Sequence, residues 1–152
     1  MNEVEWETRN WPNGQKWSET PYVDGQRHGV ETWWHDNGQK WHETPWVNGQ
    51  RHGLETHWYS DGQKWHETPW VNGQKHGVET WWHPNGQKRR ETPYVKGKNH
   101  GLETRWHPDG SLEQVVKWED GQKLLKFDFL QGDVRGDSRV QVDLLTNEYC
   151  AV

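Results

Sequence analysis

Glycine returns in this chain at a fixed interval of 24 residues, and this spacing constrains the fold more than any other feature. Fourteen of the 16 glycines fall into three series with that interval. The series are Gly14, Gly38, Gly62, Gly86 and Gly110; Gly25, Gly49, Gly73, Gly97 and Gly121; and Gly29, Gly53, Gly77 and Gly101. A period of this length is typical of repeat proteins, in which each unit buries its surface against the next. Four full units span about residues 14–109, with a partial unit on each side.

Each unit contains two turn signals, such as Asn37-Gly38 and Asn48-Gly49. Asn-Gly and Asp-Gly tolerate positive φ at both central positions of a type I′ turn. About nine to eleven residues rich in Trp, Thr, Val and Tyr lie between the turns, which is the length and composition of a β-strand. No stretch has a helical period. We therefore predict an all-β fold, an elongated single-layer antiparallel sheet in which each 24-residue unit is one β-hairpin.

The turns and the prolines predict further details of the strands. If Asn37-Gly38 is the centre of a two-residue hairpin, Trp34 pairs with Trp41 and Trp33 pairs with His42. Each Thr-Pro pair is predicted to interrupt the pairing, because proline has no N–H to donate to the ladder. These pairs are Thr20-Pro21, Thr44-Pro45, Thr68-Pro69 and Thr92-Pro93.

Side chains alternate between the two faces of a strand, so the repeat predicts two different faces. One face carries Pro21, Val23, Val30 and Trp34 with their equivalents in later repeats, and it is the richer in Val, Leu, Pro and Trp. We assign packing to this face. Its Trp34 position stays Trp in all four units, as expected for a side chain that fills a fixed space.

The opposite face changes from repeat to repeat. One position reads Trp33, His57, Trp81 and Arg105, and a neighbouring position reads Ser18, His42, His66 and Arg90. Positions that vary in this way are expected to be exposed, and Trp, Tyr and Arg are enriched at binding hot spots. The alternative, that these rings stack on one another to stabilise a sheet without a second layer, stays open for each tryptophan. The predicted partner-binding residues are Tyr22, Arg27, Trp33, Trp46, Arg51, His57, Trp70, Trp81, Tyr94 and Arg105.

Composition narrows the class of protein. Only 29% of the residues are hydrophobic, but 14 are Trp, so aromatic rings have to carry most of the apolar burial. The net charge of −5 disfavours a nucleic-acid partner, which needs a basic surface. There is no apolar run long enough to span a membrane, and the N-terminal residues lack the pattern of a signal peptide, which predicts a cytoplasmic protein. The single cysteine, Cys150, cannot form an internal disulfide.

No catalytic or metal-binding pattern stands out. The histidines His28, His52, His76 and His100 recur one hairpin apart, roughly 9.6 Å, which is too far to share a zinc ion. The glutamates of the Glu-Thr pairs recur in every unit, which predicts a structural role, whereas a catalytic site is normally singular. Phosphate-binding loops, dinucleotide fingerprints and nucleophile motifs are absent. We predict no enzyme, no metal and no cofactor.

The stretch from Tyr22 to Gly29 follows the pattern aromatic–x–x–G–x–x–H–G, and an aromatic run and a second turn follow it. This pattern resembles the MORN repeat, most closely its bacterial variant form, over about residues 6–122. Glu31 and its equivalents replace the usual second glycine, and the Thr-Pro insertion lengthens the period. The resemblance implies a hairpin array over residues 1–122. Aliphatic residues replace Trp in residues 123–152, where we predict a β cap on the open end of the sheet, with a loop at residues 131–137.

The resemblance also carries an implication for function. Many bacterial MORN-variant proteins are described as antitoxin or immunity components, which implies a partner protein, such as a toxin, that this chain binds and neutralises. A glycan-binding or small-ligand module is the alternative, because exposed Trp and Tyr rings stack on sugars. Binding to a lipid surface is a third and weaker hypothesis, since the negative net charge opposes binding to anionic lipid. A homodimer through one sheet face stays open.

Overall fold

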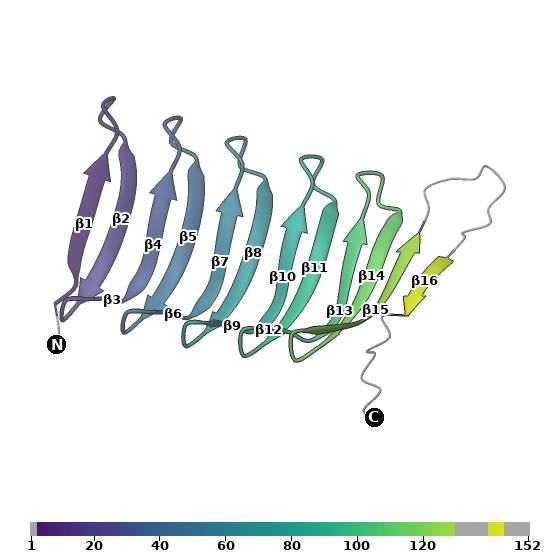
Figure 1. Cartoon of the computed structure of the whole chain (residues 1–152). Coiled ribbons are helices and arrows are strands. Elements are labelled where there is room, and N and C mark those ends of the chain that lie inside the picture. Colours follow the sequence, from purple (N-terminus) through teal and green to yellow (C-terminus); the bar gives the residue numbers. More distant parts are fainter. Residues whose placement is uncertain (1–2, 130–139, 145–152) are drawn as a thin grey trace.

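The computed structural model describes residues 3–129 and 140–144, and within them sixteen strands form one antiparallel sheet. Hairpin follows hairpin along an elongated, open sheet, so spatial order follows chain order (Figure 1). The predicted single-layer sheet of tandem hairpins is confirmed. The principal strands are, in order, β1 (Glu5–Asn10), β2 (Lys16–Val23), β4 (Gly29–Trp34), β5 (Lys40–Val47), β7 (Gly53–Trp58), β8 (Lys64–Val71), β10 (Gly77–Trp82), β11 (Lys88–Val95), β13 (Gly101–Trp106), β14 (Leu112–Glu119), β15 (Gln122–Phe129) and β16 (Val140–Leu144).

Each repeat also contains one strand of only two residues, and these four short strands lie at the same ends of the long strands. They are β3 (Gln26–Arg27), β6 (Gln50–Arg51), β9 (Gln74–Lys75) and β12 (Lys98–Asn99), and each pairs with the end of the strand before it. The predicted type I′ turns lie here. Asn48 and Gly49 have φ values of 48° and 76°, and every equivalent pair also has positive φ, which confirms this prediction.

The turns at the opposite ends of the strands, such as the one between β4 and β5, differ from the prediction. At Asn37-Gly38 only the glycine has positive φ, because Asn37 stabilises the turn with its side chain, whose Oδ1 accepts the backbone N–H of Gln39 at 3.0 Å. The N–H of Gly38 donates to the carbonyl of His35, and the N–H of His35 donates to the carbonyl of Gln39. This closes a three-residue loop in place of the predicted two-residue hairpin.

The longer loop shifts the register by one residue. Trp33 faces His42 as predicted, but Trp34 faces Lys40, so the predicted Trp34–Trp41 pair is wrong. Trp41 is the extra residue of a β-bulge, which re-aims its side chain. Its ring lies 6.2 Å from that of Trp33, edge to face, on the opposite side of the sheet from the prediction. Trp65 and Arg89 occupy the equivalent bulges in the next two repeats.

Proline interrupts the ladder between consecutive hairpins, as predicted. Strand β2 pairs with β4 only at Ser18 and Glu19, and its next partner beyond Pro21 is the short strand β3. The chain then turns back at a glycine of the third series, where the proline ring of the preceding strand leaves no space for a side chain. A Cβ on Gly53 would lie 2.9 Å from Cγ of Pro45.

Successive repeats are tied together at the turns. Trp11 Nε1–H donates to the carbonyl of Trp34 at 3.2 Å, and Tyr59 O–H donates to the carbonyl of Trp82 at 3.5 Å. His35 and His83 hold the same position and contact the carbonyls of Trp58 and Trp106 through Nε2. Different side chains therefore make the same contact with the following repeat.

The face that was predicted to be buried is the more exposed one. The face assigned to packing, here called the valine face, carries Val30, Leu54, Val78 and Leu102, which are 46–59% exposed. Pro21, Thr32, Thr56 and Thr80 are buried on this face, but most buried side chains lie on the opposite face, where Val116 is the only buried Val, Leu or Ile among the described residues. Short aliphatic side chains cannot cover their neighbours in a single layer, whereas Trp rings can.

The described part of the predicted cap, β15 and the backbone of β16, continues the same sheet, and residues 131–137 and Cys150 lie outside the described residues.

The close contact between Gly53 and Pro45 predicts a steric cost that another glycine lacks. Gly73 also has positive φ, 77°, but a Cβ there would meet nothing within 4 Å. We expect Gly53→Ala to lower the free energy of unfolding by on the order of 1–3 kcal/mol, and by more than Gly73→Ala, because only the first adds a clash to the backbone strain. Urea denaturation followed by Trp fluorescence measures both. Equal losses for the two variants would show that the proline contact is unimportant.

Candidate functional site

A row of buried glutamates runs along the face opposite the valine face, which is called the glutamate face here. Glu31, Glu55, Glu79 and Glu103 occupy equivalent positions and are 2–8% exposed. The threonines Thr20, Thr44, Thr68 and Thr92 form a parallel buried row beside them. A buried carboxylate is unfavourable unless hydrogen bonds or opposite charges compensate it. The surroundings of each glutamate are therefore under strong constraint.

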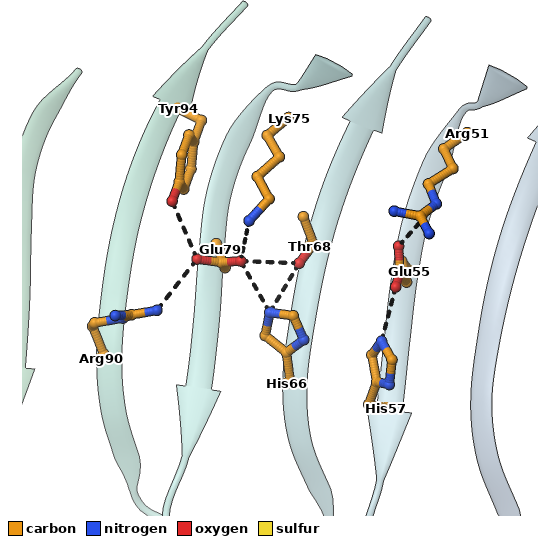
Figure 2. A network of polar contacts seen from close by, with 9 residues as sticks. All are labelled: Arg51, Glu55, His57, His66, Thr68, Lys75, Glu79, Arg90 and Tyr94. Carbon is orange, nitrogen blue, oxygen red and sulfur yellow. Dashed lines mark hydrogen bonds and ion pairs between the residues drawn. The ribbon is translucent and has the colours of Figure 1, made fainter. Parts of the chain in front are cut away.

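Glu79 shows this constraint most fully (Figure 2). Its Oε1 accepts hydrogen bonds from Lys75 Nζ at 2.7 Å and from Thr68 Oγ1 at 3.3 Å, and it lies 3.0 Å from His66 Nε2. Its Oε2 lies 3.4 Å from the Tyr94 hydroxyl and 3.5 Å from Arg90 Nη2. Burial opposes ionisation, but the hydrogen bonds from His66 and Lys75 and the charge of Lys75 outweigh it and lower the pKa of Glu79 to about 2.

The other glutamates keep the carboxylate and change its partners. Glu31 receives hydrogen bonds from Thr20 and from Trp46 Nε1, with Arg27 at 3.8 Å. Glu55 pairs with His57 at 2.8 Å and lies 3.7 Å from Arg51 (Figure 2). Glu103 receives hydrogen bonds from Arg105 and from Trp118 Nε1. Many of the predicted binding residues are thus held in place by a buried carboxylate, a role that the sequence did not reveal.

A continuous series of stacked rings, here called the aromatic ladder, crosses the glutamate face. Its neighbouring ring centroids lie 3.9–6.2 Å apart, in stacked, tilted and edge-to-face arrangements. Trp33, His57 and Trp81 are members and are half-buried, so the stacking alternative applies to these three rings. The central members of the ladder are Trp11, Trp17, Trp33, Trp41, His42, His57, Trp65, His66 and Trp81.

A second row lies nearer the type I′ turns and alternates cations with rings. Arg27 lies 4.8 Å from the ring centroid of Trp46, and Arg51 lies 4.8 Å from that of Trp70. Lys75 lies 4.9 Å from the Tyr94 ring. Such contacts are each weakly favourable and hold the charged groups over the ring faces. Tyr22 begins this row and donates its hydroxyl to Glu7.

All ten predicted binding residues therefore lie on one face, in two rows. The structure brings them together but also pairs most of them with one another. Sequence reasoning missed Trp17, Trp41 and Trp65, because the bulge moves them onto this face. It also missed Arg89, and it placed Arg90 on the variable face without naming it as a binding residue. Both line a hollow of about 290 Å³ with Trp81, Arg105 and Glu113. The signal that could have identified these arginines is the change from Gln-Lys-Trp-His in the third repeat to Gln-Lys-Arg-Arg in the fourth.

Metal binding and membrane spanning find no support in the described part of the chain. Over residues 3–129 and 140–144 no group of three or more His, Cys, Asp or Glu side chains could hold a metal ion. His28, which belongs to the evenly spaced histidine series, turns its Nδ1 toward the Asn48 side-chain oxygen of the next repeat at 3.2 Å. Those residues also contain no helix long and apolar enough to cross a membrane.

Comparison with protein families decides the class of repeat. The MORN repeat variant family matches residues 27–48, 51–72, 75–96 and 99–120, which is more than half of the chain. The chain belongs to the MORN repeat variant family. The predicted MORN repeats are confirmed, and each matched unit contains one buried glutamate and one of the three-residue loops, at Gly38, Gly62, Gly86 and Gly110. A comparison with curated proteins found no significant match. The MORN fold is a repeat-based binding module and is generally non-catalytic.

The centre of the aromatic ladder predicts a pH-dependent stability. Burial, followed by the charge of His57 5.0 Å away, lowers the pKa of His42 from 6.5 to about 4. The unfolded chain therefore binds more protons than the folded chain between these values, so the stability of the fold falls as pH drops from about 6.5 towards 4. We expect His42→Phe, which keeps a ring in the ladder, to flatten this part of the pH profile. Urea denaturation of both proteins at pH 7 and pH 5 measures it, and parallel profiles would contradict this role for His42.

Proposed function

We infer that this MORN protein is a non-catalytic module that binds a partner protein through its glutamate face. The observation that carries the proposal is a constant framework beneath variable side chains. The buried Glu and Thr rows repeat unchanged, while the ladder position beside them changes from Trp33 to His57, Trp81 and Arg105. A framework that fixes the backbone and leaves such positions free can present a different side chain in each repeat.

The held side chains suit recognition of a protein. Trp, Tyr and Arg dominate binding hot spots, and ordering a flexible side chain at an interface costs about 0.5–1.5 kcal/mol. Here that ordering is already in place, because Arg27 and Arg51 lie against Trp46 and Trp70, and the carboxylates of Glu31 and Glu55 lie close to the two arginines. A partner therefore meets a preorganised surface that extends over several repeats.

Several features disfavour the glycan alternative. Sugar stacking needs an open ring face. Trp33 instead meets Trp17 and Trp41 edge to face, at interplanar angles of 87° and 89°, and Arg51 lies over Trp70. Identical sugar units also favour identical sites, whereas the ladder position changes from repeat to repeat.

The electrostatics of the glutamates support a non-catalytic role. A general acid needs a carboxyl group whose pKa is raised towards neutrality. The pKa values of Glu55 and Glu79 are instead lowered, because hydrogen bonds from His57 and His66 and the nearby Arg51 and Lys75 outweigh burial. Glu79 also accepts hydrogen bonds from Thr68 in β8 and Tyr94 in β11, so its carboxylate holds neighbouring strands together. The antitoxin or immunity role is part of the proposal and is supported by the resemblance to bacterial MORN-variant proteins.

Affinity capture with matched variants tests the binding face. Trp33→His and Trp81→His introduce a side chain that the same position already carries at His57, so the framework is expected to persist. Val30→Thr and Val78→Thr provide the control on the valine face. Baits are incubated with a lysate of the source cells, and captured proteins are identified by mass spectrometry.

We expect one stoichiometric protein that the glutamate-face variant loses and the valine-face variant keeps. Binding is then measured with the two purified proteins, and relief of the partner's toxicity on co-expression tests the antitoxin role. Capture of no protein, or loss only with the valine-face variant, would overturn the proposed binding face.

A further inference from the structure

The aromatic ladder ends at a hollow of about 290 Å³ in the fourth repeat, lined by Trp81, Arg89, Arg90, Arg105 and Glu113. Three repeat positions change at this one place. Arg89 stands where earlier repeats have the bulge tryptophan. Arg90 and Arg105 stand where the preceding repeat has His66 and Trp81. Arg90 and Arg105 face each other on adjacent strands. The arginine lining of the hollow is therefore specific to the fourth repeat.

Two of the residues that line the hollow carry donors that make no hydrogen bond. Arg90 Nε and Trp81 Nε1 are both buried, and neither donates to any atom of the described chain. Because both atoms are buried, a ligand in the hollow meets the exposed parts of the guanidinium groups instead, and the side chain of Arg90 is 32% exposed. Arg89 is exposed and has no hydrogen-bond or ion-pair partner within the described ranges.

The balance of charge favours a singly charged ligand. Arg105 is committed to Glu103, with Nη2 at 2.7 Å from the carboxylate, and Arg90 makes only a long contact of 3.5 Å with Glu79, which already binds Lys75. Arg89 and Arg90 therefore supply the excess positive charge. Glu113 on the lining opposes the second charge of a phosphate.

The shape of the donors points to a carboxylate. A guanidinium group presents parallel N–H donors that match the two oxygens of a carboxylate. The guanidinium of Arg90 lies 5.3 Å from the ring centroid of Trp81, so an apolar stem beside the carboxylate would meet the indole. We propose that this hollow binds the carboxylate of an aspartate or glutamate side chain on the partner protein. This rests on the proposed function, because the partner presents the acidic residue.

NMR titration of the full-length protein tests the site directly. The probes are a capped tripeptide with a central glutamate, the same peptide with glutamine, and inorganic phosphate. The readouts are the indole N–H signal of Trp81, assigned by its loss in Trp81→Phe, and the Nε–H signal of Arg90. The test variant Arg89→Trp, Arg90→His restores the residues that Trp65 and His66 supply in the preceding repeat, so it is expected to fold. Lys98→Gln removes an exposed positive charge elsewhere.

We expect the glutamate peptide to shift both signals saturably, and the glutamine peptide and phosphate to bind at least about tenfold more weakly. The double variant should lose the effect of the glutamate peptide on the Trp81 signal, and Lys98→Gln should retain the effect on both signals. Equal shifts with the glutamine peptide, tighter binding of phosphate, the absence of saturable shifts, or full binding by the double variant would each overturn the proposal.

The titration also separates this inference from the proposed function. If a partner is captured through the glutamate face but the peptide does not bind, only the carboxylate site fails. If the peptide binds but no partner protein is found, the site stands and the proposed function fails.

Discussion

The fold depends on hydrogen bonds to carboxylates that are buried in a sheet with no second layer. Glu79 in β10 binds donors from the strands on both sides, His66 and Thr68 in β8 and Tyr94 and Arg90 in β11. One carboxylate thereby links three principal strands that belong to successive hairpins. Glu7 holds the equivalent position in β1, which pairs with β2 alone among the described strands, and its side chain is 45% exposed. Burial of the glutamate therefore accompanies stacking of the repeats, and a single hairpin could not achieve it.

The carboxylate accepts different partners in different repeats. Trp46, His57, Lys75 and Arg105 each donate a hydrogen bond to a buried glutamate, whereas Trp33 and Trp81 occupy the His57 position without donating from Nε1. The framework consequently tolerates different side chains from one repeat to the next. Where these are aromatic they stack into the ladder, and in the fourth repeat they become arginines. Side chains at equivalent positions can therefore differ between repeats without loss of the fold. A family of binding modules needs this property, since each repeat can then contribute a different contact.

The period of the glycines was sufficient to predict the hairpins, the single layer and the type I′ turns, because these depend on local backbone preferences. The second turn was not predictable from Asn-Gly alone, since the same dipeptide also closes the longer loop when Asn37 accepts a hydrogen bond from Gln39. That error displaced Trp41 to the wrong face. The packing face was wrong for a different reason: apolar content indicates burial only where a second layer covers it, and here large rings and paired carboxylates cover one another. A glutamate that recurs beside variable donors was the signal for the buried row.

The most direct test of this account compares Glu79→Gln with Glu7→Gln in the full chain. Glutamine keeps the size of the side chain but removes the charge that Lys75, His66 and Arg90 share. Urea denaturation at pH 7 is expected to show a loss of about 2 kcal/mol for Glu79→Gln, the scale of hydrogen bonds to a charged group. Glu7→Gln should have little effect, because that carboxylate is exposed. Similar stabilities for Glu79→Gln and the unmodified protein would contradict the claim that buried carboxylates hold the repeats together.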